Sequence, residues 1–143
     1  MTDLTSPVID TGTLPWMPLS AGVEVRLLRL EGEERSLQLK VEPGVLMAPH
    51  RHEGAVNAYG LQGYRRLGTG EIAGPGSYVY EPAGNCDSWE AVGDEPCVVQ
   101  ISMAGRLTEV ASGKSTDTSG LRERYLAWCA ETGNPAVAIG ARD

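Results

Sequence analysis

Short β-like runs, each followed by turn residues, recur along this chain at a spacing of roughly ten residues. Glycine and proline mark the turns, for example at Pro43-Gly44 and Gly74-Pro75-Gly76. The runs cover residues 23–30, 36–41, 45–49, 56–61, 64–67, 77–81, 97–103 and 107–110. Short strands at this spacing are typical of an all-β sandwich or barrel, so the sequence predicts that class.

The apolar pattern within the runs agrees with this class. Leu37, Leu39 and Val41 occupy every second position of their run, which indicates a strand with one buried face. The chain has 143 residues, which fits one domain. We expect an N-terminal arm over 1–18, a barrel over 19–111, and a linker with a C-terminal helix over 112–143. Three prolines in the arm disfavour regular structure but suit an edge strand that Trp16 anchors.

One helix is predicted near the C-terminal end. Leu121, Tyr125 and Trp128 lie at i, i+4 and i+7, which is one face of a helix. Thr118 or Ser119 can cap its start. We expect this helix to pack across the outside of the barrel, because an apolar helix stripe usually packs against a core.

Composition and charge exclude several classes of partner. The chain has 19 acidic and 12 basic side chains, a formal net charge of -7, and no dense basic cluster. Nucleic acids and anionic membranes are bound through clustered basic residues, so we expect neither as a partner. The chain has no signal-like start and no apolar stretch of about 18 residues, so we expect it in the cytoplasm. The three cysteines are unpatterned, which indicates reduced thiols.

The two histidines, His50 and His52, lie in one His-Arg-His stretch. Residues two apart on a strand point to the same face, so both imidazoles can bind one metal ion while Arg51 points away. Two spaced motifs accompany the pair. The first is Gly44, five residues, His50, one residue, His52, and the second is Gly76, five residues, Pro82, one residue, Gly84, two residues, Asp87.

These spacings resemble the two motifs of the cupin superfamily, whose second motif ends in a metal-binding histidine. Asp87 stands at that position in this sequence, and Asn57 stands where many cupins carry a glutamate or histidine. The resemblance implies a single-domain cupin, a double-stranded β-helix or jelly-roll barrel, to which the C-terminal α-helix is added. Since cupins are commonly dimers, it also implies a homodimer or a higher homo-oligomer.

A narrower resemblance is to the 2,4'-dihydroxyacetophenone dioxygenase group, which is related to acetylacetone dioxygenase. It rests on residues 15–19, on residues 79–84, and on the C-terminal helix with Tyr125 and Cys129. Enzymes of that group bind iron with three histidines and use dioxygen to cleave a carbon-carbon bond beside a carbonyl. The resemblance therefore implies an iron cofactor, a small-molecule substrate and dioxygen.

Asp87 changes the expected ligand set to two histidines and one carboxylate. That set is the facial triad of non-heme Fe(II) oxygenases, which leaves coordination positions for substrate and dioxygen. We predict a metal site of His50, His52 and Asp87 that holds Fe(II), with Mn, Ni or Zn as other candidates. Two alternatives stay open: a register shift of one residue would present Cys86 instead of Asp87, or the barrel has lost its metal.

Three further residues are candidates for catalysis: Glu81, Asn57 and Arg66. Asn57 either faces the cavity, as a weak ligand or an amide that orients substrate, or makes structural hydrogen bonds near the barrel mouth. By resemblance, Glu81 matches a glutamate that supports the metal ligands, with Arg66 or Arg65 as its cationic partner. The alternative is that all three charged side chains lie at the surface.

Five aromatic rings near the barrel are candidates to line a pocket for an aromatic substrate. They are Tyr59, Tyr64, Tyr78, Tyr80 and Trp89. The alternative is simple packing, because aromatic residues are common on strands.

The leading functional hypothesis is a metal-dependent dioxygenase that cleaves a carbon-carbon bond in a small carbonyl or phenolic substrate. A second hypothesis is a redox-neutral cyclase or isomerase of a polyketide-like small molecule, with Asp87 or Glu81 as acid or base. A third is a non-catalytic cupin that binds a small molecule, because anti-sigma factors and regulators also carry cupin barrels. Turnover without oxygen would identify the second, and binding without turnover the third.

Overall fold

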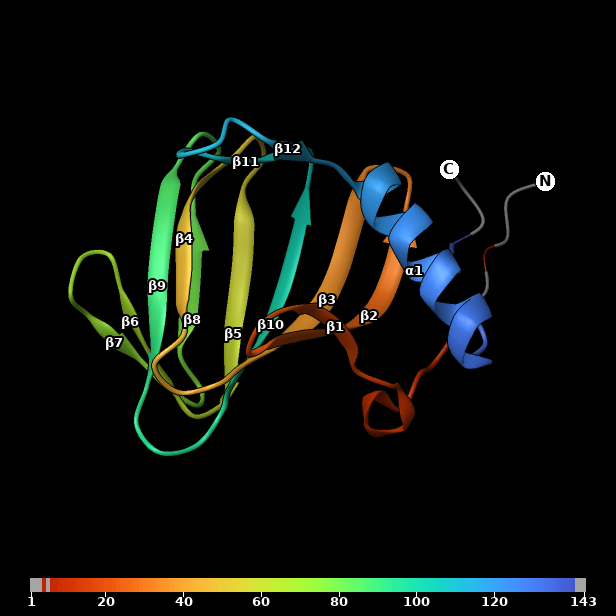
Figure 1. Cartoon of the computed structure of the whole chain (residues 1–143), viewed down its shortest axis with the longest axis horizontal. Coiled ribbons are helices and arrows are strands. Elements are labelled where there is room, and N and C mark those ends of the chain that lie inside the picture. Colours follow the sequence, from red (N-terminus) through yellow and green to blue (C-terminus); the bar gives the residue numbers. More distant parts are fainter. Residues whose placement is uncertain (1–3, 5, 141–143) are drawn as a thin grey trace.

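The structure is a computed structural model that describes residue 4 and residues 6–140. Two six-stranded antiparallel sheets face each other, and one helix lies at one end of them (Figure 1). This arrangement confirms the all-β prediction with one C-terminal helix. Among the described residues, no helix is long and apolar enough to cross a membrane.

The first sheet contains most of the core and is built around a long central pair of strands. Its order is β1 (Met17–Ser20), β2 (Val23–Glu31), β3 (Glu34–Val41), β10 (Cys97–Ala104), β5 (Val56–Gln62) and β8 (Tyr78–Glu81). The alternation read from the sequence is observed on β3, where Leu37, Leu39 and Val41 are all buried. Their side chains point between the sheets because alternate residues of a strand share one face.

The second sheet carries the candidate metal ligands. Its order is β12 (Ser115–Thr116), β11 (Leu107–Glu109), β4 (Leu46–His52), β9 (Cys86–Val92), β6 (Tyr64–Leu67) and β7 (Ile72–Ala73). β4 pairs with β9 and β9 pairs with β6, so three segments distant in sequence lie side by side in this sheet. The sequence pattern did not predict β9 as a strand.

The N-terminal segment covers part of the outer face of the first sheet. The Trp16 ring lies 4.3 Å from the Arg26 guanidinium carbon and 4.6 Å from Lys40 Nζ, which is a cation–π geometry on both sides. Beneath it, Arg26 Nε donates to Gln38 Oε1 at 2.7 Å, and Gln38 Nε2 donates to Gln100 Oε1 at 3.0 Å. Trp16 thus anchors the segment, while the boundaries 1–18, 19–111 and 112–143 stay a prediction.

Helix α1 (Thr118–Thr132) closes the end of the sandwich near β1 and β2. Its N-cap is Asp117, whose side chain accepts a hydrogen bond from Gly120 N at 2.8 Å, so neither predicted cap residue is used. Tyr125 is buried against the core on the predicted face. Arg124 Nη2 donates to the Leu19 carbonyl at 2.8 Å, which ties the helix to β1.

Candidate metal centre

His50, His52 and Asp87 come together on two neighbouring strands. β4 carries both histidines, and His50 lies directly opposite Asp87 in the antiparallel pairing of β4 with β9. One ligand atom from each of the three residues lies within 4.8 Å of the other two. Three donors this close can share one divalent ion, and two histidines with one carboxylate are a donor set that Fe(II) accepts.

The two imidazoles are buried and differ in their hydrogen bonding. His50 is 8% exposed, and its Nδ1 lies 2.8 Å from the Ala48 carbonyl oxygen. A carbonyl only accepts, so Nδ1 is the donor and Nε2 remains available as a metal ligand. His52 is 4% exposed, and its Nδ1 is buried with no hydrogen-bond partner among the residues that the structure describes.

Electrostatics keep His52 in the form that binds metal ions. Burial, with a smaller contribution from His50, lowers the pKa of His52 to about 4. The imidazole is therefore neutral at pH 7, as a metal ligand must be. A buried imidazole nitrogen without a partner is costly, and coordination of an ion would offset that cost. The three residues therefore fit a metal ion on chemical grounds.

Glu81 lies at the end of β8, beside the same cavity, and is 8% exposed. Asn85 Nδ2 donates to Glu81 Oε1 at 3.1 Å. Burial, and then the nearby Asp87 carboxylate, raise the pKa of Glu81 to about 7, while Asn85 and Arg65 act in the opposite direction. The carboxyl of Glu81 is thus close to the candidate metal ligands without belonging to the ligand set.

Arg65, and not Arg66, lies beside Glu81 and Asp87. Arg65 is 4% exposed, and its guanidinium carbon lies 4.9 Å from the centre of the Trp89 ring. Arg66 points to the opposite face of β6, where Nη1 forms an ion pair with Glu90 Oε1 at 3.3 Å in a solvent-exposed position. The strand period explains the difference, because adjacent residues of β6 face opposite sides of the sheet.

Asn57 also lies away from the cavity. It is exposed on the outer face of the first sheet, where its Oδ1 accepts a hydrogen bond from the Tyr78 hydroxyl. Ala58, its neighbour on β5, lines the cavity instead. Asn57 therefore makes a structural hydrogen bond, which was the second of the two roles considered for it, and its position does not support a direct role at the metal.

The predicted aromatic lining is mostly absent from the cavity as well. Tyr59, Tyr64, Tyr78 and Tyr80 are all exposed on outer faces of the two sheets, whereas Trp89 is buried and lines the cavity. Trp89 lies on β9 two residues after Asp87, and so on the same face. The walls are otherwise mainly aliphatic.

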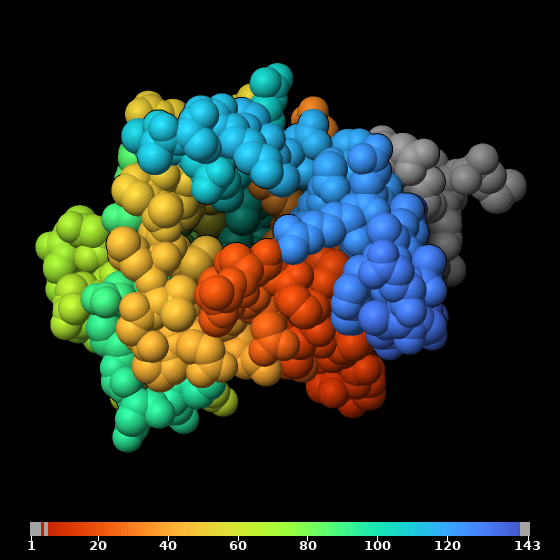
Figure 2. Space-filling model, viewed as in Figure 1, coloured from red at the N-terminus to blue at the C-terminus, as the bar shows by residue number. Residues whose placement is uncertain are grey.

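The cavity between the sheets has a volume of about 590 Å³. Its aliphatic wall includes Leu37, Leu39, Ile101 and Met103, which lie opposite the second sheet that carries the histidines. Figure 2 shows the hollow on the surface, surrounded by the segments that contain β1, β4, β11–β12 and α1. This volume suits a small organic molecule, because ligand cavities usually measure about 300–1,000 Å³.

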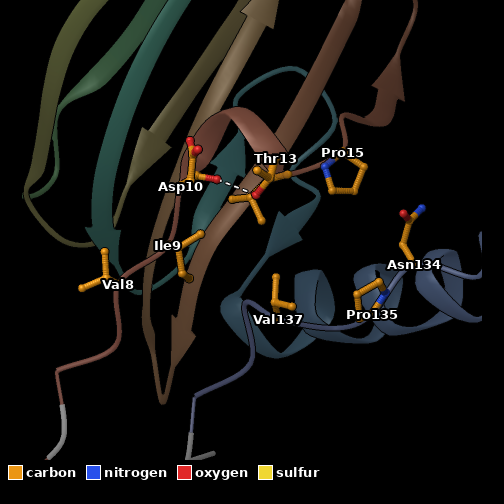
Figure 3. A pocket seen from close by; sticks show the side chains of 9 residues that line it. Val8, Ile9, Asp10, Thr13, Pro15, Asn134, Pro135 and Val137 are labelled. Atoms are coloured by element: carbon orange, nitrogen blue, oxygen red, sulfur yellow. Dashed lines mark hydrogen bonds between the residues drawn. The ribbon is translucent and has the colours of Figure 1, made fainter.

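A smaller cavity of about 320 Å³ lies elsewhere, between residues 8–15 and residues 134–137 (Figure 3). Its one ionisable side chain, among the lining residues that the structure describes, is Asp10. Asp10 caps the short 3-10 helix η1 (Thr11–Thr13) by accepting from Gly12 N at 3.0 Å. Its backbone carbonyl accepts from Thr13 Oγ1 at 2.7 Å. Among the described residues that line this cavity, no group of three metal-ligating side chains is found.

Sequence reasoning missed Arg35, a second buried arginine of the large cavity. Arg35 is 6% exposed, and Nη1 donates to the Gly105 carbonyl and to Thr118 Oγ1, both at 2.8 Å. It lies two residues before Leu37 on the same face of β3. The alternation of residues 35, 37 and 39 could have identified Arg35 as an inward-facing residue. A charged residue near the start of a strand is, however, usually exposed.

Comparisons with known proteins agree with this architecture. Residues 5–104 match the family described as the ChrR cupin-like domain. An RmlC-like cupin protein of Ralstonia eutropha JMP134 is 26% identical and has a TM-score of 0.82, with 97% of this chain and 93% of that chain covered. A comparison with curated proteins finds no match to this sequence.

Two solved structures of enzymes share the fold at lower identity. An acetylacetone dioxygenase from Acinetobacter johnsonii is 17% identical with a TM-score of 0.74, covering 89% of this chain and 94% of that one. The polyketide cyclase RemF from Streptomyces resistomycificus is 15% identical with a TM-score of 0.62, covering 84% and 94%. The family match over residues 5–104 confirms the cupin resemblance read from the sequence.

Proposed function

We propose, from the premise that this chain belongs to the ChrR cupin-like domain family, that it is a metal-dependent dioxygenase. In this proposal it cleaves a carbon-carbon bond in a small carbonyl or phenolic substrate. The observation that carries it is the cluster of His50, His52 and Asp87, whose ligand atoms lie within 4.8 Å of one another at the wall of a cavity. The similar fold of an acetylacetone dioxygenase supports it.

Fe(II) is the proposed metal, held by His50, His52 and Asp87, and Mn, Ni and Zn are the other candidates. When bound, the ion would supply Lewis acidity and open coordination positions for substrate and dioxygen. The hydrogen bond from His50 Nδ1 to Ala48 fixes the orientation of that imidazole. Asp87 supplies the negative charge of the ligand set.

The other residues of the cavity position the ligands and the substrate. Arg65, a cation, and Glu81, a carboxyl, both interact electrostatically with Asp87. Together they orient the Asp87 carboxylate. Trp89 packs against the Arg65 guanidinium and limits its movement. The aliphatic wall excludes water from the apolar part of a substrate and strengthens polar interactions in the cavity.

Oxygen consumption tests this proposal. After anaerobic loading with Fe(II), the protein should consume oxygen when given pentane-2,4-dione or 2,4'-dihydroxyacetophenone, and the consumption should require both iron and substrate. His52→Ala should abolish it, whereas Arg66→Ala, which changes an exposed ion pair, should preserve it. An iron-loaded protein that remains inert toward a panel of 1,3-dicarbonyls and hydroxyketones would contradict the proposal.

A second candidate function is redox-neutral cyclisation or isomerisation of a polyketide-like molecule. The observation that favours it is the buried Glu81 carboxyl beside the cavity, which is placed to exchange a proton with a bound molecule. The fold shared with a polyketide cyclase is consistent with it. Turnover under strict exclusion of oxygen would identify this function, and tight binding without turnover would identify a non-catalytic binding protein.

A homodimer or higher homo-oligomer in the cytoplasm completes the proposal. Tyr59, Tyr78 and Tyr80 are exposed on one face of the first sheet, and tyrosines are enriched at protein interfaces. β8 is also an edge strand of that sheet. Light scattering should therefore give a mass above the 15.2 kDa of one chain, and a monomer at high concentration would remove this part of the proposal.

A further inference from the structure

We propose that Arg35 binds a carboxylate group of the molecule that occupies the large cavity. The inference deepens the proposed function, on which it rests for the identity of the cavity as the substrate site. It assigns a substrate class: a small molecule with an apolar body and one carboxylate separate from any group that binds the metal.

Arg35 is a charged residue on a strand, β3, whose other cavity-lining residues, Leu37 and Leu39, are apolar. It lines the cavity, is 6% exposed, and shares the inward face of β3 with Leu37 and Leu39. Burial lowers the pKa of its guanidinium, and Asp117 acts in the opposite direction. Holding a guanidinium out of water is costly unless it is paired with an anion and hydrogen-bonded.

Its hydrogen bonds within the protein use only one of the three nitrogens. Nη1 donates to the Gly105 carbonyl and to Thr118 Oγ1, and Thr118 Oγ1 in turn donates to the Glu33 carbonyl at 2.6 Å. All these acceptors are neutral, and together they fix the orientation of the guanidinium. Within the described part of the chain, Nε and Nη2 have no hydrogen-bond partner, and no carboxylate lies within 4.0 Å.

Arg65 differs from Arg35 in this respect. The charge of Arg65 interacts with Asp87 and Glu81, and its guanidinium packs on Trp89. The attraction that Arg35 experiences comes from Asp117, which also lines the cavity but whose carboxylate serves as the N-cap of α1. Among the described residues, the buried arginines of the cavity are Arg35 and Arg65, and Arg35 is the one whose guanidinium forms no ion pair within 4.0 Å and interacts only with a carboxylate that already caps a helix.

The charge of the whole cavity also favours an anion. Among the described lining residues, four cationic side chains balance four carboxylates when all are ionised, so a bound divalent ion would leave an excess of positive charge. The cations are Arg35, Arg65, Lys114 and Arg124, and the carboxylates are Glu81, Asp87, Glu109 and Asp117. Arg35 also lines the same cavity as the candidate metal ligands His50, His52 and Asp87. A carboxylate bound by Arg35 would thus lie beside the metal centre, with the apolar body against the aliphatic wall.

The test compares the binding of an acid with that of its amide. Isothermal titration calorimetry would measure the binding of 3-phenylpropionate and of 3-phenylpropanamide to the whole 143-residue chain, as purified and after dialysis against EDTA. We expect the acid to bind at least about tenfold more tightly than the amide, because guanidinium–carboxylate bonds are charge-assisted. Arg35→Gln should remove this preference and leave the amide affinity unchanged, whereas Arg66→Gln should change neither.

Arg35→Lys covers the case in which Arg35→Gln fails to fold, since Arg35 also ties Gly105 to Thr118. Lysine keeps the charge but loses the two-point geometry, so the acid should bind severalfold less tightly while the amide binds as before. Equal affinity of acid and amide for the wild type, or an acid preference that survives in Arg35→Gln, would overturn the inference. An equal loss for acid and amide in Arg35→Lys would do the same. This test measures binding and not oxygen consumption. A negative result for carboxylate binding is therefore distinguishable from failure of the dioxygenase proposal.

Discussion

Glu81→Gln should stabilise the metal-free protein, and the gain should grow as the pH rises. Burial and the Asp87 carboxylate raise the pKa of Glu81 from 4.5 to about 7 in the folded protein. Between these pH values the folded chain holds a proton that the unfolded chain has released. The free energy of unfolding of the wild type therefore falls as the pH rises through this window.

The size of the effect follows from the two pKa values. Each pH unit between them corresponds to about 1.4 kcal/mol, so the wild type loses at most about 3 kcal/mol from this group above pH 7. Glutamine carries no titrating proton and can still accept the hydrogen bond from Asn85 that Glu81 accepts at 3.1 Å. The variant should match the wild type near pH 4.5 and exceed it increasingly toward neutral pH.

Urea unfolding followed by tryptophan fluorescence measures this difference in EDTA-dialysed protein. The control is Glu53→Gln, since Glu53 lies at the surface in an ion pair with Arg106 at 3.8 Å. A difference in unfolding free energy between Glu81→Gln and the wild type that stays constant from about pH 4.5 to about pH 7.5 would refute the reasoning. It would show that the Glu81 carboxyl is hydrated and not buried beside Asp87.

Three further predictions concern stability. Thr118→Val should lower the free energy of unfolding by about 2–4 kcal/mol, because it leaves the buried partners of the Thr118 hydroxyl unsatisfied. A loss of under about 1 kcal/mol, measured by chemical denaturation, would contradict this. Trp16→Ala should cost about 1–2 kcal/mol and speed proteolysis of the N-terminal segment, since the ring packs between two cations; an unchanged digestion rate would argue against its anchoring role. Arg66→Ala should change stability by less than about 1 kcal/mol, because its ion pair with Glu90 is exposed, and a larger loss in a thermal melt would show a role that the structure does not explain.

The sequence predicted the candidate ligand set through the strand period of the histidine pair and through the resemblance of the second motif to the cupin pattern. The His-x-His pair needs only the strand period to place both imidazoles on one face, and the second motif places Asp87 by its distance from Pro82. Both features are local along the chain. The structure brings the two segments together because β4 and β9 are neighbours in the second sheet, with His50 opposite Asp87.

The residues around the ligands were harder to predict because they depend on strand parity. Asn57 and Arg66 each lie one residue away from the side chain that faces the cavity, Ala58 in one case and Arg65 in the other. A shift of one residue moves a side chain to the opposite face, and the apolar pattern around Arg65 is too short to decide between the two.

β9 escaped prediction for a related reason. Cys86–Val92 mixes polar and apolar residues because its inward face carries Asp87 as well as Trp89. A carboxylate at an inward position hides the alternation that identifies a strand. Arg35 was missed in the same way, since a charged residue on the inward face of β3 is an exception to the usual burial pattern.

Metal content tests the central claim most directly. Elemental analysis of protein purified without a histidine tag, before and after anaerobic Fe(II) loading, should show near-stoichiometric metal in the wild type and a large loss in Asp87→Ala. The matched control, Asp94→Ala, removes an exposed carboxylate in the turn before β10 and should keep the wild-type content. A wild type that binds no metal after loading, or an Asp87→Ala variant that retains it fully, would contradict the assignment of His50, His52 and Asp87 as the metal centre.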